Sequence, residues 1–249
     1  MSKTRSSDTL VIVPAYNEEE SIGALLSEIG AHVPQFDVLV VNDGSSDDTA
    51  AVVLDRGVAL LDLPCNLGVG GAVQAGFRFA YERGYRYGVR CDGDGQHPPS
   101  EIPKLVAAMR EHKADLIIGS RFLGGKSYTS TPIRYLGIAV LGWLLSIICR
   151  KRVTDPTSGF QMLNLPLLHF FGHSYPTDYP EPEALALLRR QGYDFHEVAV
   201  TFRERSAGRS SIRGWGTLYY LMKVFLALLV DRARPVNPRF DRSRLEKLA

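Results

Sequence analysis

Two aspartates one residue apart, Asp92 and Asp94, are the side chains in this sequence best suited to chemistry. They lie in "CDGDGQHP", which follows the apolar and aromatic run from Tyr85 to Val89. At the end of a strand, alternation points both carboxylates to the same side, where they repel each other unless a cation offsets the repulsion. Carboxylate oxygens suit Mg²⁺ or Mn²⁺, which bind through one or two carboxylates plus substrate phosphates. We therefore predict a site for a metal and a diphosphate, with an acidic surface turn as the alternative.

Polar residues also follow the first two expected strands. The first strand is followed by "PAYNEEES", where the free N–H groups of a starting helix favour anions and polar ligands. The second is followed by "NDGSSDDT", which places Asp43 in a turn. Helix capping and turn chemistry alone would explain either motif. Their joint occurrence favours a ligand site, and the candidates in the first motif are Pro14, Tyr16, Asn17 and Glu18.

A glycine-rich stretch, "NLGVGGAVQAGF", runs from Asn66 to Phe77. It does not match the dinucleotide fingerprint GxGxxG, because a count from Gly68 and Gly70 puts Val73 at the third glycine position. The glycines would instead permit a close approach of backbone, either of a helix to the sheet or of the protein to a diphosphate. Both interpretations stay open from this motif alone.

The elements that must position these motifs alternate along the first half of the chain. Short apolar runs predict strands at Leu10–Val13, Val38–Val41, Ala59–Leu63, Tyr87–Cys91 and Asp115–Gly119. Helical patterns lie between them, near Glu18–Ala31, Asp47–Arg56, Val69–Arg83 and Ser100–His112. The alternation predicts an α/β fold with a mostly parallel sheet covered on both faces. Ligands bind beyond the carboxyl ends of the strands in such sheets, where the motifs above lie.

Two later segments are more apolar than a soluble enzyme needs. The segment from Tyr135 to Cys149 carries no charge over fifteen residues. As a helix it would span roughly 22 Å, short of the ~30 Å hydrocarbon core of a bilayer. The segment from Trp215 to Val230 is interrupted by Lys223 and followed by charged residues, a pattern typical of an interfacial helix. Two helices buried in the core or in a dimer interface are the alternative.

Composition places the chain among globular proteins. It has 249 residues, of which 45% are apolar and 22% charged, which excludes a disordered or fibrous class. Cys65, Cys91 and Cys149 stand far apart, so neither a disulfide framework nor a zinc site is indicated. The N-terminal residues lack the apolar stretch of a signal peptide, so we expect the protein to stay inside the cell. From Thr201 onward the chain has eleven Lys and Arg against four Asp and Glu, which predicts an anionic partner.

The order and spacing of five motifs resemble those of the family 2 glycosyltransferases, which have the GT-A fold. These motifs are "VIVPAYNEEESI", "VVNDGSSDDT", "NLGVGGAVQAGF", "CDGDGQHPP" and "GSRF". Three later motifs are similar to the branch of dolichyl-phosphate mannose synthase and bacterial polyprenyl-phosphate glycosyltransferases: "DPTSGF", "DYPEPEALALLRRQGY" and "RERSAGRSSI". The resemblance covers residues 9 to 230. It implies a metal-dependent, inverting transfer of a sugar from a UDP- or GDP-sugar to a polyprenyl or dolichyl phosphate.

The resemblance implies roles on the donor side of the site. Asp43 would contact the base and Glu18 would lie near the ribose. Asp92 and Asp94, supported by Gln96, would place Mg²⁺ or Mn²⁺ on the diphosphate. The full set of implied nucleotide contacts is Pro14, Tyr16, Asn17, Glu18, Asp43 and Gly71.

On the acceptor side, the resemblance implies that Arg121 and Arg134 grip the acceptor phosphate and that Arg205 neutralises the donor phosphate. Arginine suits these roles because its planar fork makes bidentate hydrogen bonds to phosphate. Asp155 and Glu183 match acidic positions of the same branch and are candidate catalytic residues. Each arginine taken alone could equally lie in a solvated surface pair.

The acceptor decides whether a general base is needed. A lipid phosphate is already anionic and requires none, whereas a saccharide hydroxyl would need a carboxylate such as Asp155, Glu181 or Glu183 to take its proton. A family 2 transferase acting on a hydroxyl is therefore the alternative function. A nucleotide-sugar binding protein without activity is disfavoured, because the aspartate pair and the arginines are all present.

The expected layout has four parts. These are a tail at 1–8, a catalytic domain at 9–211 that contains an interface helix at about 135–149, a second interface helix at 212–230 and a basic tail at 231–249. We expect a cytoplasmic protein, peripheral on the inner face of the cell membrane, where Arg150, Lys151 and Arg152 would meet anionic headgroups. A small separate membrane protein is the expected anchor. A homo-oligomer is compatible with the sequence, and no nucleic-acid partner is expected.

Overall fold

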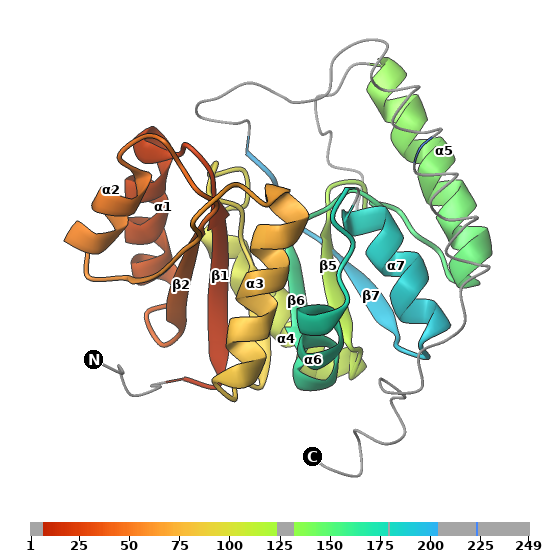
Figure 1. Ribbon diagram of the computed structural model, residues 1–249. Helices are drawn as coiled ribbons and strands as arrows, with labels where there is room; N and C mark the ends of the chain where they lie inside the picture. Colours follow the sequence, from red (N-terminus) through yellow and green to blue (C-terminus); the bar gives the residue numbers. More distant parts are fainter. Residues whose placement is uncertain (1–6, 124–131, 179, 204–222, 224–249) are drawn as a thin grey trace.

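The computed structural model describes residues 7–123, 132–178, 180–203 and 223. Within these residues one sheet has seven strands in the order β3-β2-β1-β4-β6-β5-β7 (Figure 1). The strands are β1 (Thr9–Ala15), β2 (Asp37–Asn42), β3 (Ala59–Asp62), β4 (Tyr87–Arg90), β5 (Leu116–Ser120), β6 (Gln161–Asn164) and β7 (Phe195–Ala199). The mostly parallel α/β fold predicted from the sequence is confirmed.

One strand runs against the others. β1 pairs in parallel with β2 and β4, β2 with β3, and β5 with β7. β6 pairs antiparallel with both β4 and β5. The carboxyl ends of the parallel strands therefore meet the amino end of β6 at one edge, which we call the catalytic edge. β6 and β7 were not predicted, because "QMLN" and "FHEVA" are short and break apolar alternation with polar residues.

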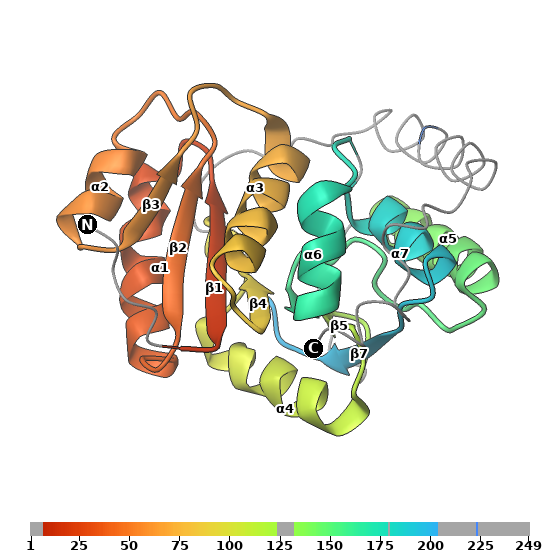
Figure 2. The same ribbon diagram turned by 60° about the horizontal axis from the view of Figure 1, so that its bottom comes forward.

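Helices cover both faces of the sheet. The helices are α1 (Glu19–His32), α2 (Thr49–Asp55), α3 (Gly68–Glu82), α4 (Ile102–His112), α5 (Pro132–Cys149), α6 (Leu165–His173) and α7 (Pro180–Arg190). Side chains of α1, α2 and α4 share one core with Val11 and Val13 of β1. Side chains of α3, α5, α6 and α7 share the other with Leu10 and Ile12. Figure 2 shows α4 beneath the sheet and α3 and α6 above it.

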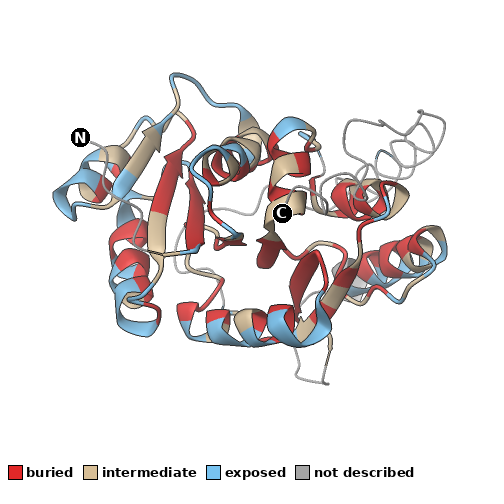
Figure 3. Cartoon of the chain, turned by 90° about the horizontal axis from the view of Figure 1, so that it is seen from below, coloured by how far each residue is buried: buried red, intermediate tan, exposed pale blue. Residues whose placement is uncertain are grey.

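Burial follows this layering. All seven residues of β1 are buried, whereas the helices alternate buried and exposed positions (Figure 3). The elements predicted in the first half of the chain agree with the observed ones to within two residues at each end, including the helix expected near Ser100–His112. There, a short 3-10 turn at Pro99–Glu101 precedes α4. α2 begins at Thr49 instead of Asp47, and its N-cap residue is Asp48. The Asp47 carboxylate accepts the Thr49 N–H at 3.0 Å in the turn that leads into the helix.

Helix α5 has two different apolar faces. Leu141, Leu145 and Cys149 recur at a spacing of four residues and are buried on the side that packs on α7. On the other side large apolar residues are exposed, and we call this set the α5 outer stripe: Leu136, Val140, Trp143 and Ile147. No helix of the described residues is long and apolar enough to cross a membrane. The second apolar segment lies outside the described residues, apart from Lys223.

Candidate active site

The loops that follow β1 and β2 are tied to each other at the catalytic edge. The Asn17 N–H donates to Ser45 Oγ at 2.9 Å, and Asn17 Oδ1 accepts from the Ser46 N–H at 2.8 Å. Asn17 has a positive φ of 53°, which Asn tolerates better than most side chains. Its side chain therefore holds the two motifs together as one unit. Tyr16 beside it is 49% exposed and available to a ligand.

The "CDGDGQHP" loop is fastened to the end of β1. The Gly93 N–H donates to the Pro14 carbonyl at 3.1 Å. Ser21 Oγ lies 3.0 Å from the Gly93 carbonyl and 2.7 Å from Glu18 Oε2. The backbone between the two aspartates thus rests on Pro14, and one hydroxyl links it to the Glu18 carboxylate. Pro14 and Glu18 therefore lie next to the aspartate pair, as neighbouring parallel strands require.

Asp43 is buried at the end of β2, where it fixes the start of α3. Its Oδ1 accepts the Leu67 N–H at 2.7 Å. Burial raises the pKa of the Asp43 carboxyl above its usual value, although backbone hydrogen bonds from Leu67 and Gly68 act against the rise. The carboxylate therefore links the second motif to the glycine-rich stretch. Its role in base recognition stays a prediction.

The glycine-rich stretch allows a close approach between parts of the protein. A side chain at Gly70 would meet the Pro176 carbonyl at 2.5 Å and Thr177 Cα at 2.7 Å. At Gly71 the three nearest atoms would all belong to the Leu67 side chain, the first at 2.5 Å. Packing of helix against loop therefore explains Gly70, and the contact of Gly71 with a diphosphate stays a prediction.

Asp92 is held by a buried arginine that sequence reasoning missed. Arg90 Nε lies 2.8 Å from Asp92 Oδ1, and Arg90 Nη1 lies 2.7 Å from Glu181 Oε1 of α7. The Arg90 side chain is 2% exposed. Burial disfavours its charge, but Asp92 and Glu181 outweigh that effect and raise the pKa of Arg90 well above its usual value. An arginine two residues before an aspartate in a buried strand was the available signal, since alternation puts both on one side.

Gly159 of "DPTSGF" borders the same ion pair. A side chain there would meet Arg90 Nη2 at 2.7 Å and Asp92 Oδ2 at 2.9 Å. Only a residue without a β-carbon leaves room for the guanidinium against this turn. The motif "DPTSGF" is thus joined to the aspartate pair by packing.

Asp94 occupies a different environment from Asp92. It is 5% exposed, and its Oδ1 accepts the Gln96 N–H at 3.0 Å. The Gln96 carbonyl in turn accepts the Arg203 N–H at 3.0 Å. These bonds fix the second half of the loop. The role of Gln96 at a metal stays a prediction.

His97 closes the loop beneath Asp92. Its Nδ1 accepts the Asp92 N–H at 2.9 Å, which requires an unprotonated Nδ1. Burial lowers the pKa of His97, and this outweighs the opposite effect of the Asp92 and Asp94 charges. The ring stacks on Phe160 at 5.0 Å between centroids. His97 is therefore a neutral support of the loop.

One aromatic ring joins the loop to the expected acceptor side. Phe202 meets the His97 ring edge-on at 4.9 Å, and the Arg121 guanidinium lies 5.1 Å from its centroid. Arg121 therefore belongs to the same site as the aspartate pair. Such a contact between guanidinium and ring also favours the charged side chain.

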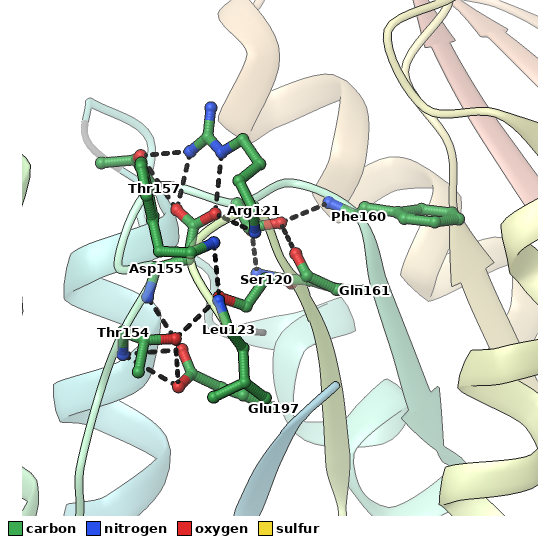
Figure 4. A network of polar contacts seen from close by, with 12 residues as sticks. Ser120, Arg121, Leu123, Thr154, Asp155, Thr157, Phe160, Gln161 and Glu197 are labelled. Atoms are coloured by element: carbon green, nitrogen blue, oxygen red, sulfur yellow. Dashed lines mark hydrogen bonds and ion pairs between the residues drawn. The ribbon is translucent and has the colours of Figure 1, made fainter. Parts of the chain in front are cut away.

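Arg121 is gripped by Asp155 (Figure 4). Its Nε and Nη2 lie 2.7 Å from Asp155 Oδ2 and Oδ1, and its backbone N–H donates to Oδ2 at 3.0 Å. Thr157 Oγ1 accepts from Nη2 at 2.7 Å. Both charged residues are buried. Asp155 thus orients the arginine, and this bidentate pair fixes the plane of the guanidinium.

A second carboxylate that sequence reasoning missed holds Asp155 in place. Glu197 of β7 accepts the Asp155 N–H at 2.9 Å and the Thr154 N–H at 2.8 Å. Burial raises the pKa of Glu197, against the effect of these hydrogen bonds. Figure 4 shows the chain of contacts from Glu197 through Thr154 and Asp155 to Arg121. An acidic residue among the mostly apolar residues of "FHEVAV" was the signal that could have found it.

The remaining candidates are not all brought together. Glu183 is half-buried in the first turn of α7, where its neighbour Glu181 contacts Arg90. Arg134 lies in α5, but its side chain is outside the described part of the chain, and Arg205 lies outside it altogether. Their roles stay predictions.

Comparison with known proteins identifies the family. The profile of glycosyl transferase family 2 matches residues 10–168. The chain belongs to glycosyl transferase family 2. It is 35% identical over 219 residues to an undecaprenyl-phosphate mannosyltransferase of Micrococcus luteus, covering 82% of this chain and 87% of the relative. It is 31% identical over 241 residues to a polyprenol monophosphomannose synthase of Mycolicibacterium smegmatis, covering 92% and 91%. The protein is thus a glycosyltransferase, as the motifs predicted.

Solved structures confirm the fold of this family 2 enzyme. Glucosyl-3-phosphoglycerate synthase from Mycobacterium tuberculosis, solved with phosphoglyceric acid, superposes with a TM-score of 0.66 at 21% identity. That match covers 93% of this chain and 81% of the other. The same synthase was also solved with Mn²⁺, uridine diphosphate and glucosyl-3-phosphoglycerate, with a TM-score of 0.65 at 22% identity over 93% and 81% of the two chains. The GT-A fold is therefore shared.

Proposed function

We propose that this family 2 enzyme moves a sugar from a UDP- or GDP-sugar to a polyprenyl phosphate, with inversion, at the cytoplasmic face of the membrane. The observation that carries the proposal is that the aspartate pair and the Arg121 guanidinium belong to one connected set of contacts at the catalytic edge. The aspartate pair suits the donor diphosphate, and Arg121, connected to it through Phe202 and His97, suits the acceptor phosphate. The substrates of the two relatives named above support the acceptor.

A divalent cation fits the residues present. Among the described residues no group of three or more His, Cys, Asp or Glu side chains is arranged to hold a metal. Mg²⁺ or Mn²⁺ commonly binds one or two carboxylates plus substrate phosphates, and Asp92 and Asp94 supply two carboxylates. When bound, such a cation would stabilise negative charge on the leaving diphosphate. The Mn²⁺ and uridine diphosphate in the related synthase structure support the same assignment here.

On the acceptor side, Arg121 would bind the attacking phosphate. Asp155 already fixes the Arg121 guanidinium in the absence of substrate, so the side chain loses little conformational freedom when the phosphate binds. An ionised phosphate oxygen needs no general base, and Asp155 is engaged with Arg121 instead of being placed to take a proton. The buried carboxylate therefore acts through the arginine in this mechanism.

The α5 outer stripe supports a membrane-facing acceptor. Four large apolar side chains lie exposed along one helix, followed closely by Arg150, Lys151 and Arg152. An apolar stripe bordered by cations suits the boundary between acyl chains and anionic headgroups. A small membrane protein as anchor stays a prediction, which recovery of such a partner from detergent extracts would test.

The direct test is transfer of label from UDP- and GDP-sugars to a polyprenyl phosphate in detergent, with Mn²⁺ or Mg²⁺ and with EDTA. We expect label in the lipid phase with one donor, and its loss in EDTA. Asp94→Asn should reduce transfer by at least about 100-fold, because it removes a carboxylate that would hold the cation against the leaving diphosphate. Arg78→Gln, a change in an exposed ion pair of α3, is the control.

Two results would contradict the proposal. Lipid product that forms equally well in EDTA would show that transfer does not require a divalent cation. Metal-dependent release of nucleoside diphosphate without lipid product would instead favour a hydroxyl acceptor, and Glu181→Gln and Glu183→Gln would then be compared for loss of turnover.

A further inference from the structure

Arg90 forms a buried junction between the aspartate pair and helix α7. Its Nε lies 2.8 Å from Asp92 Oδ1, its Nη2 lies 3.3 Å from Asp92 Oδ2, and its Nη1 lies 2.7 Å from Glu181 Oε1. The side chain of Arg90 is 2% exposed, while those of Asp92 and Glu181 are 28% and 16% exposed. The two carboxylates thus reach the site surface from opposite sides of one buried cation.

Stability alone does not account for this arrangement. A buried strand position is ordinarily apolar, as are Val89 of β4 and Ile12 of the adjacent β1. Ion pairs removed from water gain little net stability compared with packed apolar side chains. A guanidinium that grips both oxygens of Asp92 does, however, fix the direction of that carboxylate.

We propose that Arg90 is a positioning residue that sets the orientation of Asp92 for the cation, and that Glu181 holds Arg90 in place. The inference rests on the proposed function, because it assumes that Asp92 and Asp94 bind a metal with the donor diphosphate. It makes α7 part of the donor half of the site, although Glu181 stands 91 residues from Arg90 in sequence.

A role of Arg90 through its charge and a role through its geometry predict different effects of Arg90 variants on metal-dependent nucleotide binding. Arg90 carries a positive charge next to a cation site, so its charge alone opposes the binding of Mn²⁺. If Arg90 acted only through charge, Arg90→Gln would strengthen metal-dependent binding and Arg90→Lys would leave it unchanged. If Arg90 acts by orientation, both variants weaken it, because lysine is a point charge that lacks the planar fork.

The experiment measures the affinity of the full chain for UDP, with GDP in parallel, by calorimetry in Mn²⁺ and in EDTA. The ratio of the two affinities reports the metal-dependent part of binding. We expect Arg90→Lys, Arg90→Gln and Glu181→Gln each to lower this ratio by about 10-fold or more, the usual effect of losing a residue that orients a metal ligand. Binding in EDTA should change much less. Because Arg90 and Glu181 act together, the double variant Arg90→Lys/Glu181→Gln should show less than the sum of the two single effects.

The control is the exposed pair Arg78 and Glu82 of α3, where Arg78→Lys and Glu82→Gln should leave the ratio unchanged. Thermal unfolding of every variant shows that binding is measured on folded protein, and Glu181→Gln, a milder change at a partly exposed residue, serves where an Arg90 variant does not fold. A ratio that rises in Arg90→Gln, or stays unchanged in Arg90→Lys and Glu181→Gln, would overturn the positioning role while leaving the proposed function intact. A native chain that binds neither nucleotide more tightly in Mn²⁺ would overturn both.

Discussion

Burial determines the charge of His97, the imidazole beneath Asp92. Its Nδ1 accepts a backbone N–H and its ring lies between Phe160 and Phe202. A protonated ring could not accept that hydrogen bond and would place a charge among aromatic side chains. The folded protein therefore keeps His97 neutral, and its pKa lies below the ordinary value of 6.5.

A pH dependence of stability follows from that lowered pKa. Below pH 6.5 the His97 imidazole is protonated in the unfolded chain but stays neutral in the folded protein. The free energy of unfolding therefore falls as the pH falls toward the folded pKa. The contribution is fully present above pH 6.5, and its slope reaches at most about 1.4 kcal/mol per pH unit. Urea unfolding between pH 7.5 and pH 5 should show a smaller decrease for His97→Gln than for the native chain. A matching decrease in His97→Gln, with exposed His32→Gln as control, would contradict this assignment.

Asp155 and Arg121 show how a buried pair divides its effects between stability and binding. Asp155→Asn leaves the Arg121 charge buried without its main counter-charge, and we expect a loss of about 3–5 kcal/mol in the free energy of unfolding. The released guanidinium should also bind acceptor less well, so the KM for polyprenyl phosphate should rise more than the KM for the nucleotide sugar. Steady-state kinetics at a temperature where the variant is folded checks this. Equal changes in both KM values would indicate that Arg121 does not bind the acceptor.

At the scale of elements, the turn before β6 limits what the site can tolerate. Gly159→Ala would place a β-carbon 2.7 Å from Arg90 Nη2 and 2.9 Å from Asp92 Oδ2. We expect a loss of stability of about 1–3 kcal/mol from overpacking, together with reduced transfer activity. Gly30→Ala is the matched control, because no atom lies within 4 Å of a side chain there. In helix α1 that change should stabilise by about 0.5–1 kcal/mol. Unfolding curves and initial rates of both variants test the comparison, and an unaffected Gly159→Ala would count against a tight turn.

Local sequence patterns predicted the first five strands and their helices because apolar periodicity is a property of neighbouring residues. The same patterns located Asp92, Asp94 and Asp43 at strand ends. They did not reveal Glu181 as a partner of Arg90, because that contact joins residues far apart in the chain. Glu197 was missed for a similar reason, since its partners Thr154 and Asp155 come from another segment. Motifs thus located the candidate site residues, and long-range packing decided which residues support them.

At the scale of the whole molecule, the exposed apolar side chains differ in where they lie. Helices α2 and α5 stand at opposite ends of the molecule (Figure 1). Leu136 in the α5 outer stripe is 64% exposed and Leu54 in α2 is 61% exposed. The two leucines are therefore matched in type and exposure and differ in position.

That match gives a test of membrane contact. Leu136→Gln should lower the partition of the protein onto vesicles with anionic lipids by about 10-fold, since insertion of a leucine contributes on the order of 1.5 kcal/mol. Leu54→Gln should leave partition unchanged, because α2 would face away from the vesicle. Co-sedimentation of both variants provides the measurement. Equal losses would indicate that α5 does not define the membrane-facing side.

The reversed direction of β6 has a consequence for how this enzyme could diversify. The chain leaves the sheet after β5 and re-enters it at β6 at the same edge, where the Gly119 N–H donates to the Phe160 carbonyl at 2.8 Å. This excursion carries Arg121, Asp155 and helix α5, whereas the aspartate pair and Asp43 lie outside it. The ends of the segment adjoin, and loops between fixed ends accept change more readily than strands do. The segment is nevertheless tied to the rest of the fold, by Asp155 to Glu197 of β7 and by the packing of α5 on α7. We therefore expect the segment to be exchangeable together with its partner residues on α7 and β7: such a graft from a relative should carry over acceptor preference and leave donor preference with the host.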